Sequence, residues 1–491
     1  MRAYVSLSLV VAAIIVMAVG CSVPQATPSS GTEDAIAVTQ EEAKTASNNV
    51  VSGWSSWGCD WYNTHRGRAP QGPHENIAHR MTGVGMSIHS DPMTVGQPGE
   101  EDIVYVTTTG GTLARIDWNQ YGNLEVTQYG GPGLPCNNNA STPSMSNYGR
   151  VHYALTGGYL VTFDTNTLTF GPHYSLGAPL SNRFTSPEIG KIDGPNDNSP
   201  IVYVQGGDGF YVTSTDSDNY DDYWSFVHGV NCCGLFNDPC NGAAQFVVLQ
   251  ENLLGCTVIN CYRARARQDL PLEWRMYSVP LEGAMVQKSV TMIDVDPFFW
   301  PGDCIVVCDN AMYYLAKDPE QDVHDLPWRL IPFDCEPIQP ELGAYVSSAA
   351  LVFTHGGWYA YVLQLEYVQG PEPYHDLRLV VYSVNPVTKQ MAYFWNSDAL
   401  DYAGSGHTTP AVDISGYAYI TATIPDPFQP PGQPPMTANR FLVYDPWGGD
   451  DDPEFVYPIY GSDIQSSPSI GSDGRVYVTT DVGTVHAFYE P

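Results

Sequence analysis

The stretch from Ser466 to Phe488 restricts the fold of this chain more than any other, because it reads as three short strands joined by tight turns. Asp473-Gly474 is one such turn, since glycine tolerates the positive φ angle that primed hairpin turns need. Residues 476–478 are Val-Tyr-Val, and β-branched and aromatic residues favour a pleated, mostly buried strand. Much of the chain between residues 87 and 465 repeats this unit in a looser form, so the sequence predicts a series of β-meanders.

Seven looser copies precede the terminal unit, at a spacing of about 45–60 residues. Several open on a tripeptide rich in Ser and Thr that ends in proline: Ser90-Asp91-Pro92, Ser141-Thr142-Pro143, Thr185-Ser186-Pro187 and Thr408-Thr409-Pro410. The strands expected in the seven copies are 104–106 with 113–117, 151–154 with 160–164, 202–204 with 210–212, 246–249 with 257–259 and 274–277, 289–292 with 304–308 and 312–315, 359–363 with 379–382, and 418–420 with 441–445. The fourth copy departs most from the pattern, which leaves seven units as the alternative to eight.

The terminal unit, with Ser-Ser-Pro, Asp-Gly, Val-Tyr-Val and a second glycine turn, resembles the repeat of pyrroloquinoline-quinone (PQQ)-type β-propellers. The resemblance implies an all-β fold, namely an eight-bladed β-propeller with four-stranded antiparallel blades, or a seven-bladed one. A propeller also suits a chain of 491 residues, because single hydrophobic cores stop growing near about 250–300 residues. Most proteins with this repeat look like binding scaffolds rather than enzymes.

The two ends of the repeat region are expected to meet. Residues 57–70 resemble the tryptophan-containing lead-in of these propellers. The last unit ends at Phe488 without an outer strand, whereas residues 77–86 can form one more strand. That early strand is expected to complete the last blade and so remove an exposed sheet edge. Residues 54–491 are therefore predicted to be a single propeller closed by strands from both chain ends.

The N-terminal segment predicts export. Arg2 precedes an apolar run of about 15 residues, which is short for a membrane span. Ala18-Val19-Gly20-Cys21 looks like a bacterial lipobox, so residues 1–21 are expected to be a lipoprotein signal peptide with lipid on Cys21; a signal peptide without lipid is the alternative. Residues 22–53 are rich in Ser, Thr, Ala, Pro and Gln and predict a disordered tether. The expected location is extracytoplasmic, anchored to a bacterial membrane, the outer membrane where one is present, or at the cell surface.

The charge balance excludes some partners. The chain has 20 Lys and Arg against 53 Asp and Glu, a net charge of −33. Such a surface repels nucleic-acid phosphates and anionic lipid headgroups, so we expect no nucleic-acid partner and no membrane contact apart from the lipid. Solubility alone explains the charge, while divalent cations or basic partners are the alternatives it favours. The expected form is a monomer that binds a protein or a carbohydrate.

The chain has eleven cysteines, and ten remain without Cys21, an even number that suggests up to five disulfides in an exported protein. Cys304 and Cys308 flank a strand, so their Cα atoms lie about 13 Å apart, too far for a mutual bridge. Cys256 and Cys261 can bridge only if the chain turns between them. The disulfide candidates are Cys59, Cys136, Cys232, Cys233, Cys240, Cys256, Cys261, Cys304, Cys308 and Cys335.

The adjacent pair Cys232 and Cys233 allows two interpretations. One is a vicinal disulfide, a feature also seen in some quinoprotein alcohol dehydrogenases. The other, which we favour, gives each sulfur a different partner, one of them Cys240, because a vicinal bond requires a strained peptide unit.

Carboxylates are concentrated in residues 216–222. Their spacing can wrap Ca²⁺ in a loop, although the loop lacks the Gly and the distal Glu of an EF-hand, and a solvated acidic loop is the alternative. The predicted ligands are Asp216, Asp218, Asp221 and Asp222. Residues 448–454 form a similar, weaker candidate. No nucleophile elbow, phosphate loop or His-Glu-x-x-His motif is found, and no catalytic residue is assigned.

Three functions fit these observations. The first is a non-enzymatic, lipid-anchored binding scaffold, whose recognition segments would include the long hairpin insertions at 364–376 and 426–439. The second resembles the outer-membrane assembly lipoprotein that uses an eight-bladed propeller of this repeat. The third is a PQQ- and calcium-dependent quinoprotein dehydrogenase, whose tryptophan floor and Glu, Asn and Asp calcium ligands have no residue-by-residue match here. We therefore expect no cofactor, with calcium as the alternative and PQQ disfavoured.

Overall fold

The computed structural model describes residues 71–491 apart from residues 97–100, 132, 135–140, 146–148, 176–186, 192–199, 207–208, 215–224, 229–234, 239–244, 254–255, 268–269, 274–275, 282–290, 294–302, 318–329, 333–337, 341–342, 369–373, 403–407, 426–436, 460–463 and 465. Between residues 188 and 281 it gives the course and pairing of strands without side chains. Cys21, the tether, the lead-in and the aspartates at 216–222 lie outside the described residues, so what is predicted for them stays a prediction.

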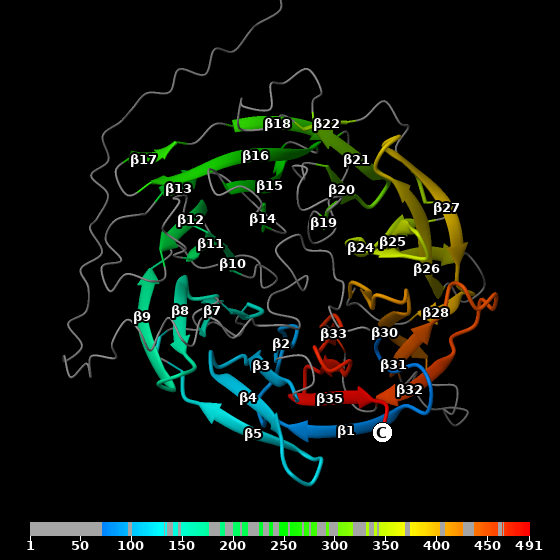
Figure 1. Cartoon of the computed structure of the whole chain (residues 1–491), viewed down its shortest axis with the longest axis horizontal. Helices are drawn as coiled ribbons and strands as arrows, with labels where there is room; N and C mark the ends of the chain where they lie inside the picture. Colours follow the sequence, from blue (N-terminus) through cyan, green and yellow to red (C-terminus); the bar gives the residue numbers. More distant parts are fainter. Residues whose placement is uncertain are drawn as a thin grey trace, which may run out of the picture. The chain divides into compact units, whose positions relative to one another are not determined.

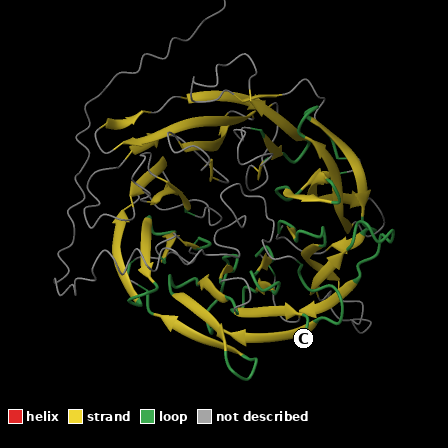
Figure 2. Ribbon diagram, viewed as in Figure 1, coloured by secondary structure: helices red, strands yellow, loops and turns green. Residues whose placement is uncertain are grey.

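Every regular element among the described residues is a β-strand, as Figure 2 shows. In this part of the chain there is also no helix that could cross a membrane. The described strands, β1 to β35, form eight antiparallel sheets. The sheets follow one another in chain order around a ring, with the first strand of each nearest the centre (Figure 1). This is the all-β architecture that the repeats predict.

The first four sheets contain the units predicted as one to four. The first has β2 (Met93–Val95), β3 (Ile103–Thr107), β4 (Leu113–Trp118) and β5 (Leu124–Tyr129). The second has β6 (Ser144–Met145), β7 (Arg150–Leu155), β8 (Tyr159–Asp164) and β9 (Thr169–Ser175). The third has β10 (Glu188–Lys191), β11 (Pro200–Gly206), β12 (Gly209–Ser214) and β13 (Ser225–His228). The fourth has β14 (Leu235–Asp238), β15 (Gln245–Leu253), β16 (Cys256–Arg267), β17 (Leu270–Glu273) and β18 (Met276–Leu281).

The remaining sheets contain units five to eight. The fifth has β19 (Thr291–Met292), β20 (Cys304–Val307), β21 (Met312–Lys317) and β22 (Leu330–Pro332). The sixth has β23 (Ala344–Tyr345), β24 (Ala350–Thr354), β25 (Gly357–Val368), β26 (Tyr374–Asn385), β27 (Gln390–Asn396) and β28 (Leu400–Tyr402). The seventh has β29 (Ala411–Val412), β30 (Ala418–Pro425), β31 (Thr437–Tyr444) and β32 (Phe455–Ile459). The last has β33 (Ser469–Ile470), β34 (Val476–Thr479), β35 (Thr484–Tyr489) and β1 (Ala78–Gly83).

The last sheet joins the two ends of the repeat region. β1 pairs with β35 in an antiparallel register that runs from Ala78 opposite Tyr489 to Gly83 opposite Thr484. The strand predicted within residues 77–86 is thereby confirmed, and it supplies the outer strand that the terminal unit lacks. The number of blades stays a prediction. The seven-bladed alternative depends on the fourth unit, and for that unit the structure describes the strand pairings but not the side chains.

The strand pairings decide two further points. The segment 364–376 lengthens a hairpin, as predicted, because β25 and β26 continue through it in register to Val368 opposite Tyr374. Cys256 and Cys261 both lie in the uninterrupted strand β16, which pairs continuously with β15. Five residues of extended chain span about 16 Å, so the turn that a bridge between these two cysteines requires is absent.

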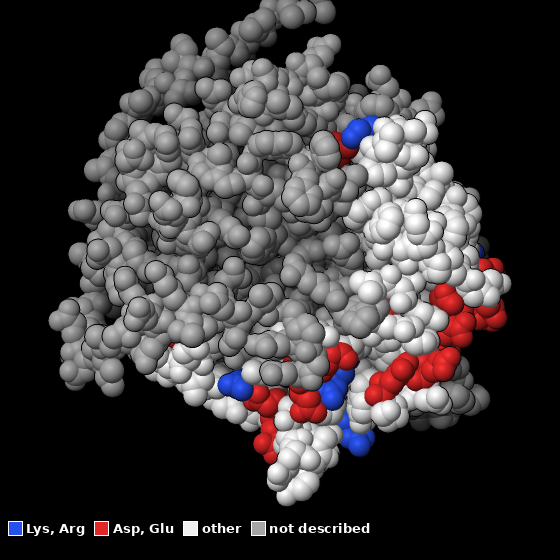
Figure 3. Space-filling view, in the orientation of Figure 1, with Lys and Arg blue, Asp and Glu red and all other residues white. Residues whose placement is uncertain are grey.

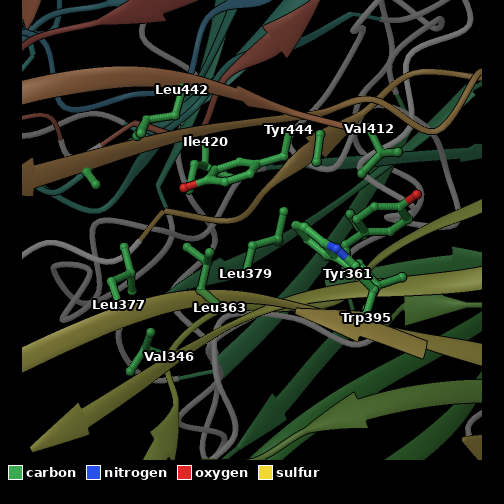
Figure 4. Close-up of a cluster of buried hydrophobic side chains, with 14 of the residues drawn as sticks. Val346, Tyr361, Leu363, Leu377, Leu379, Trp395, Val412, Ile420, Leu442 and Tyr444 are labelled. Carbon is green, nitrogen blue, oxygen red and sulfur yellow. The ribbon is translucent and has the colours of Figure 1, made fainter. Parts of the chain in front are cut away.

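The hydrophobic core lies between neighbouring sheets. Tyr361 of β25 packs in one buried cluster with Ile420 of β30 and Leu442 of β31, as Figure 4 shows. The same arrangement joins the last sheet to the first, where Tyr477 of β34 packs with Val104 of β3. Because successive side chains of a strand point to opposite faces, a sheet can pack on both of its neighbours, as the first, sixth, seventh and eighth sheets do. The ring is therefore held together by repeated contacts between sheets.

Candidate interaction surface

The Ser/Thr-rich tripeptides tie neighbouring sheets together at their inner ends. The backbone N–H of Thr409 donates to Ser467 Oγ at 3.0 Å, and that of Ser467 donates to Asp91 Oδ1 at 2.6 Å. The N–H of Asp91 in turn donates to Thr142 Oγ1 at 2.9 Å. Each side chain thus satisfies a buried N–H of the preceding sheet. The motif that identifies the repeat therefore has a structural role at these junctions.

The start of the second strand of a sheet lies beside the next sheet. Tyr361 and Tyr477 are buried and pair with the innermost strand of their own sheets. Tyr359 and Arg475 stand two residues earlier and so occupy equivalent positions in the sixth and eighth sheets. Each contacts a tryptophan of the following sheet, although the chemistry of the two contacts differs.

Between the eighth and first sheets the contact is a cation on an aromatic ring. The guanidinium carbon of Arg475 lies 4.1 Å from the centroid of the Trp118 ring. Its Nη1 atom lies 2.9 Å from Asp473 Oδ2, and its Nη2 atom lies 3.3 Å from Glu101 Oε1. The charges of Asp473 and Glu101 help to raise the pKa of Arg475, against the effect of burial. This site binds a guanidinium that the chain itself supplies.

Between the sixth and seventh sheets the equivalent position forms an aromatic cluster. Tyr359 meets the Trp447 ring edge-on, with centroids 5.1 Å apart. His355 stacks on Trp447 at 4.5 Å, and Phe394 lies 5.4 Å from Trp447 and 5.0 Å from Tyr359. His355 is exposed, Phe394 is 39% exposed, and the other two rings are half-buried. Four rings from two sheets thus form a continuous surface that reaches solvent.

Local sequence explains how these rings are placed. Gly416 has a φ angle of +97°, and a Cβ atom there would lie 2.6 Å from Cζ3 of Trp447, so only glycine leaves room for the indole. The N–H of Trp447 donates to Asp445 Oδ1 at 2.9 Å, which fixes the turn after β31. The pairing of β26 with β27 shifts by one residue at Phe394, and this bulge directs the ring outward.

Five carboxylates lie in the turn that carries Trp447. Asp450, Asp451, Asp452 and Glu454 are exposed and Asp445 is half-buried. Figure 3 shows acidic side chains gathered at the lower right of the ring, over the turn between β31 and β32. Among the described residues, no Lys or Arg forms an ion pair with any of the five. We call these carboxylates and the four rings of His355, Tyr359, Phe394 and Trp447 the aromatic–acidic surface.

The negative field of this turn reaches the neighbouring strand. Tyr417 precedes β30, and burial raises the pKa of its hydroxyl, with further increases from the charges of Asp445 and Glu454. Negative charges raise the pKa of a phenol because they disfavour the phenolate. The field at this surface is therefore one that attracts cations.

The described residues do not form a metal site. No three His, Cys, Asp or Glu side chains there lie close enough together to hold an ion. The carboxylates of residues 448–454, which the sequence offered as a weaker calcium loop, thus do not converge. The predicted calcium ligands Asp216, Asp218, Asp221 and Asp222 lie outside this part of the chain.

The cysteines with described side chains are both buried. Cys304 lies in β20 and Cys308 in the turn after it, and the two do not bridge each other, as strand geometry required. Cys308 is a free thiol here, one of the two states that the sequence left open for it, and burial raises its pKa to about 12. The disulfide pairing of the other cysteines stays a prediction.

Sequence reasoning missed the aromatic–acidic surface. Residues 448–454 were recognised as acidic, but Trp447 beside them and Tyr359, almost ninety residues earlier, gave no joint signal. Aligning the sheets by their buried tyrosines would have placed Tyr359 at the Arg475 position. The insertion at 426–439, predicted as a recognition loop, is described only from Thr437, where β31 begins.

The comparisons with known proteins bear on the fold. No protein-family model matches the chain, and a search of curated proteins found no match. Among solved structures, the quinohemoprotein alcohol dehydrogenase from Comamonas testosteroni is 13% identical with a TM-score of 0.54, covering 92% of this chain and 82% of that one. A europium-containing methanol dehydrogenase is 11% identical with a TM-score of 0.54, covering 92% of this chain and all of that one. BamB from Moraxella catarrhalis is 11% identical with a TM-score of 0.45, covering 84% of this chain and 98% of that one.

The dehydrogenase resemblance implies a tryptophan floor and a calcium site at the ring centre. The described innermost strands β2, β6, β24, β29 and β33 carry no tryptophan, and the tripeptides before them are engaged between sheets. The expectation that the chain binds no PQQ stays a prediction. Identities of 11–13% establish the fold alone, and the chain is accordingly a β-propeller similar in architecture to the PQQ-type propellers.

Proposed function

We propose that this protein is an extracytoplasmic, lipid-anchored β-propeller that acts as a non-enzymatic binding scaffold for a protein or carbohydrate partner. The observation that carries the proposal is the aromatic–acidic surface, where rings reach solvent at the junction of two sheets beside carboxylates that form no ion pair with a described Lys or Arg. Such features on a rigid frame are typical of recognition sites.

The frame beneath the surface supports this function. Trp447 packs against the buried cluster that contains Tyr361 and Leu442, and Tyr359 packs against the same cluster. The rings are therefore held in place before any partner arrives, which lowers the entropy lost on binding. A preformed surface of this kind needs no catalytic group to be useful.

Binding can be tested on the full chain, displayed on a support and exposed to an envelope extract and to a set of oligosaccharides. The double variant His355→Ser/Phe394→Ser removes two exposed rings and is expected to lose the retained partner. Tyr121→Ser is the matched control, because Tyr121 is 78% exposed in a different sheet. Equal retention by the wild type and both variants would show that this surface is not where the scaffold binds.

The competing enzymatic function is tested in parallel. The purified protein is titrated with PQQ and Ca²⁺ while its absorbance and dye-linked alcohol oxidation are followed. We expect neither a cofactor spectrum nor turnover, and a clear spectrum with turnover would replace the scaffold proposal.

The anchor is tested through Cys21. We expect the wild type to partition with membranes and Cys21→Ala to be released. If the variant still partitions with membranes, the lipid anchor is wrong, whereas the binding function would be unaffected.

A further inference from the structure

We infer that the partner of the aromatic–acidic surface is a protein segment that presents arginine side chains. This inference rests on the proposed scaffold function and adds the chemistry of the partner. It comes from comparing two junctions between sheets within this one chain.

The junction between the eighth and first sheets shows what such a site binds. There the Arg475 guanidinium lies over Trp118 and between the carboxylates of Asp473 and Glu101. A planar cation thus lies over an indole and forms ion pairs with two carboxylates. The chain therefore contains its own example of arginine bound by this combination of groups.

The junction between the sixth and seventh sheets has the same components except the cation. Trp447 contacts the position equivalent to Arg475, as Trp118 contacts Arg475 itself, and Asp445 and Glu454 both lie beside Gly448, the residue after Trp447. The position equivalent to Arg475 is taken by Tyr359, which has no positive charge. No Lys or Arg of the described residues forms an ion pair here, so the positive charge can come from a partner.

Charge complementarity favours a cationic partner over a neutral one. Five carboxylates occur within residues 445–454, on a chain whose net charge is −33. Exposed carboxylates of one sign repel each other, and a cation relieves this repulsion while steering the encounter. Arginine suits the site better than lysine, because its planar guanidinium stacks on rings and pairs with carboxylates at the same time.

The packing of Trp447 argues against a sugar. A sugar ring binds on an open aromatic face, whereas His355 stacks on Trp447 at 4.5 Å, and Gly416 lies against the six-membered ring of the indole. The rings that remain accessible are His355 and Phe394 at the edge of the cluster. A guanidinium can stack on these rings and, unlike a neutral sugar, is also attracted by the carboxylates of the turn.

The test titrates the full chain with a short synthetic peptide in which arginine alternates with serine, and follows binding by calorimetry. Peptides with lysine or glutamate in place of arginine, and a neutral oligosaccharide, are titrated alongside. The triple variant Asp450→Asn/Asp451→Asn/Asp452→Asn removes three exposed charges from the surface. The control Asp117→Asn/Glu125→Gln/Asp164→Asn removes three charges from the first and second sheets, so its net charge equals that of the surface variant.

The wild type is expected to bind the arginine peptide, and the surface variant is expected to bind it on the order of tenfold more weakly. The control should stay within about twofold of the wild type, since its charges lie outside the site. Phe394→Ser should reduce the preference for arginine over lysine, which a purely electrostatic attraction would not produce.

Three outcomes would overturn the inference. Equal losses in the two triple variants would show that the peptide responds to net charge alone. Equal binding of the lysine and arginine peptides would exclude stacking on the rings. Binding of the oligosaccharide without binding of the arginine peptide would make the partner a carbohydrate, and the scaffold function would survive.

The scaffold function itself fails if neither the peptides nor the oligosaccharide bind and the envelope extract also yields no partner.

Discussion

The Nε2 atom of His79 lies 2.9 Å from the Nδ1 atom of His486, so two imidazole rings join β1 to β35 by a side-chain hydrogen bond. The Tyr457 hydroxyl lies 2.9 Å from His79 Nδ1, and His486 Nε2 lies 3.1 Å from Thr484 Oγ1. In this series of hydrogen bonds each imidazole ring donates at one nitrogen and accepts at the other, as a neutral imidazole does.

This pair predicts a loss of stability in acid. Burial, and then the charge of Arg80, lowers the pKa of His79 from 6.5 to about 4, and burial, and then His79, lowers that of His486 to about 4. The unfolded chain therefore takes up protons that the folded chain refuses, so folding stability falls as pH drops from about 6.5 towards about 4. The double variant His79→Gln/His486→Gln lacks this titration. Its urea-unfolding midpoint should decline less than that of the wild type over the same range, and parallel declines would contradict the prediction.

A buried carboxyl at the junction of the last and first sheets predicts the opposite pH dependence. Asp102 is 1% exposed, and its carboxyl lies so close to Gly96 and Gly471 that a Cβ atom at either would overlap it. Burial, and then the charge of Asp473, raises the pKa of Asp102 to about 7. The stabilising contribution of its protonated form is present below about pH 4 and is lost as pH rises through about 7.

Asp102→Asn mimics the protonated carboxyl at every pH. We expect this variant to exceed the wild type by on the order of 1–3 kcal/mol in the free energy of unfolding above pH 7, and to match it in acid. Asp117→Asn, at a more accessible carboxylate, is the control and should show no such pH-dependent gain. A destabilised Asp102→Asn at alkaline pH would refute this account.

Gly416 is expected to tolerate no side chain. Gly416→Ala would place a Cβ atom 2.6 Å from Trp447 Cζ3 at a φ angle of +97°. Gly449→Ala is the matched control, because Gly449 has a φ angle of +79° with open space around its Cβ position. Both changes cost about 1 kcal/mol for the backbone, and Gly416→Ala should lose roughly 2 kcal/mol more and alter tryptophan fluorescence. Equal losses in thermal unfolding would show that the indole is not held by this glycine.

Ser467 is expected to stabilise two junctions at once. Its Oγ atom accepts from the buried N–H of Thr409, and its own N–H donates to Asp91. Ser467→Ala leaves the Thr409 N–H without an acceptor and should lower the free energy of unfolding by roughly 1–3 kcal/mol. Ser467→Thr keeps the hydroxyl and should recover most of that loss in chemical denaturation. A loss for threonine as large as that for alanine would point to packing rather than hydrogen bonding.

The repeat pattern predicts the strands because each unit is defined by local signals. The Val-Tyr-Val segment at 476–478 and its glycine turns specify strands and hairpins within a few residues, and the missing outer strand identifies residues 77–86 as its completion. The extension of β25 and β26 was also readable, since residues 363–368 alternate between apolar and polar types up to Tyr367.

The candidate surface was beyond sequence reasoning for a geometric reason. Whether Tyr359 meets Trp447 or solvent depends on how far one sheet is rotated relative to the next, and no local pattern specifies that rotation. The same limit applies to the contact of Arg475 with Trp118. The residues at one junction are far apart in the sequence, so their contacts can be identified only from the assembled ring.

The pairing of β1 with β35 also sets an order of events during synthesis. A strand made near the start of the domain stays unpaired until residues 484–489 have emerged. Until then the eighth sheet is unfinished, and the bare edges of β1 are open to premature association. The ring can therefore close only after the strand at 484–489 has been synthesised.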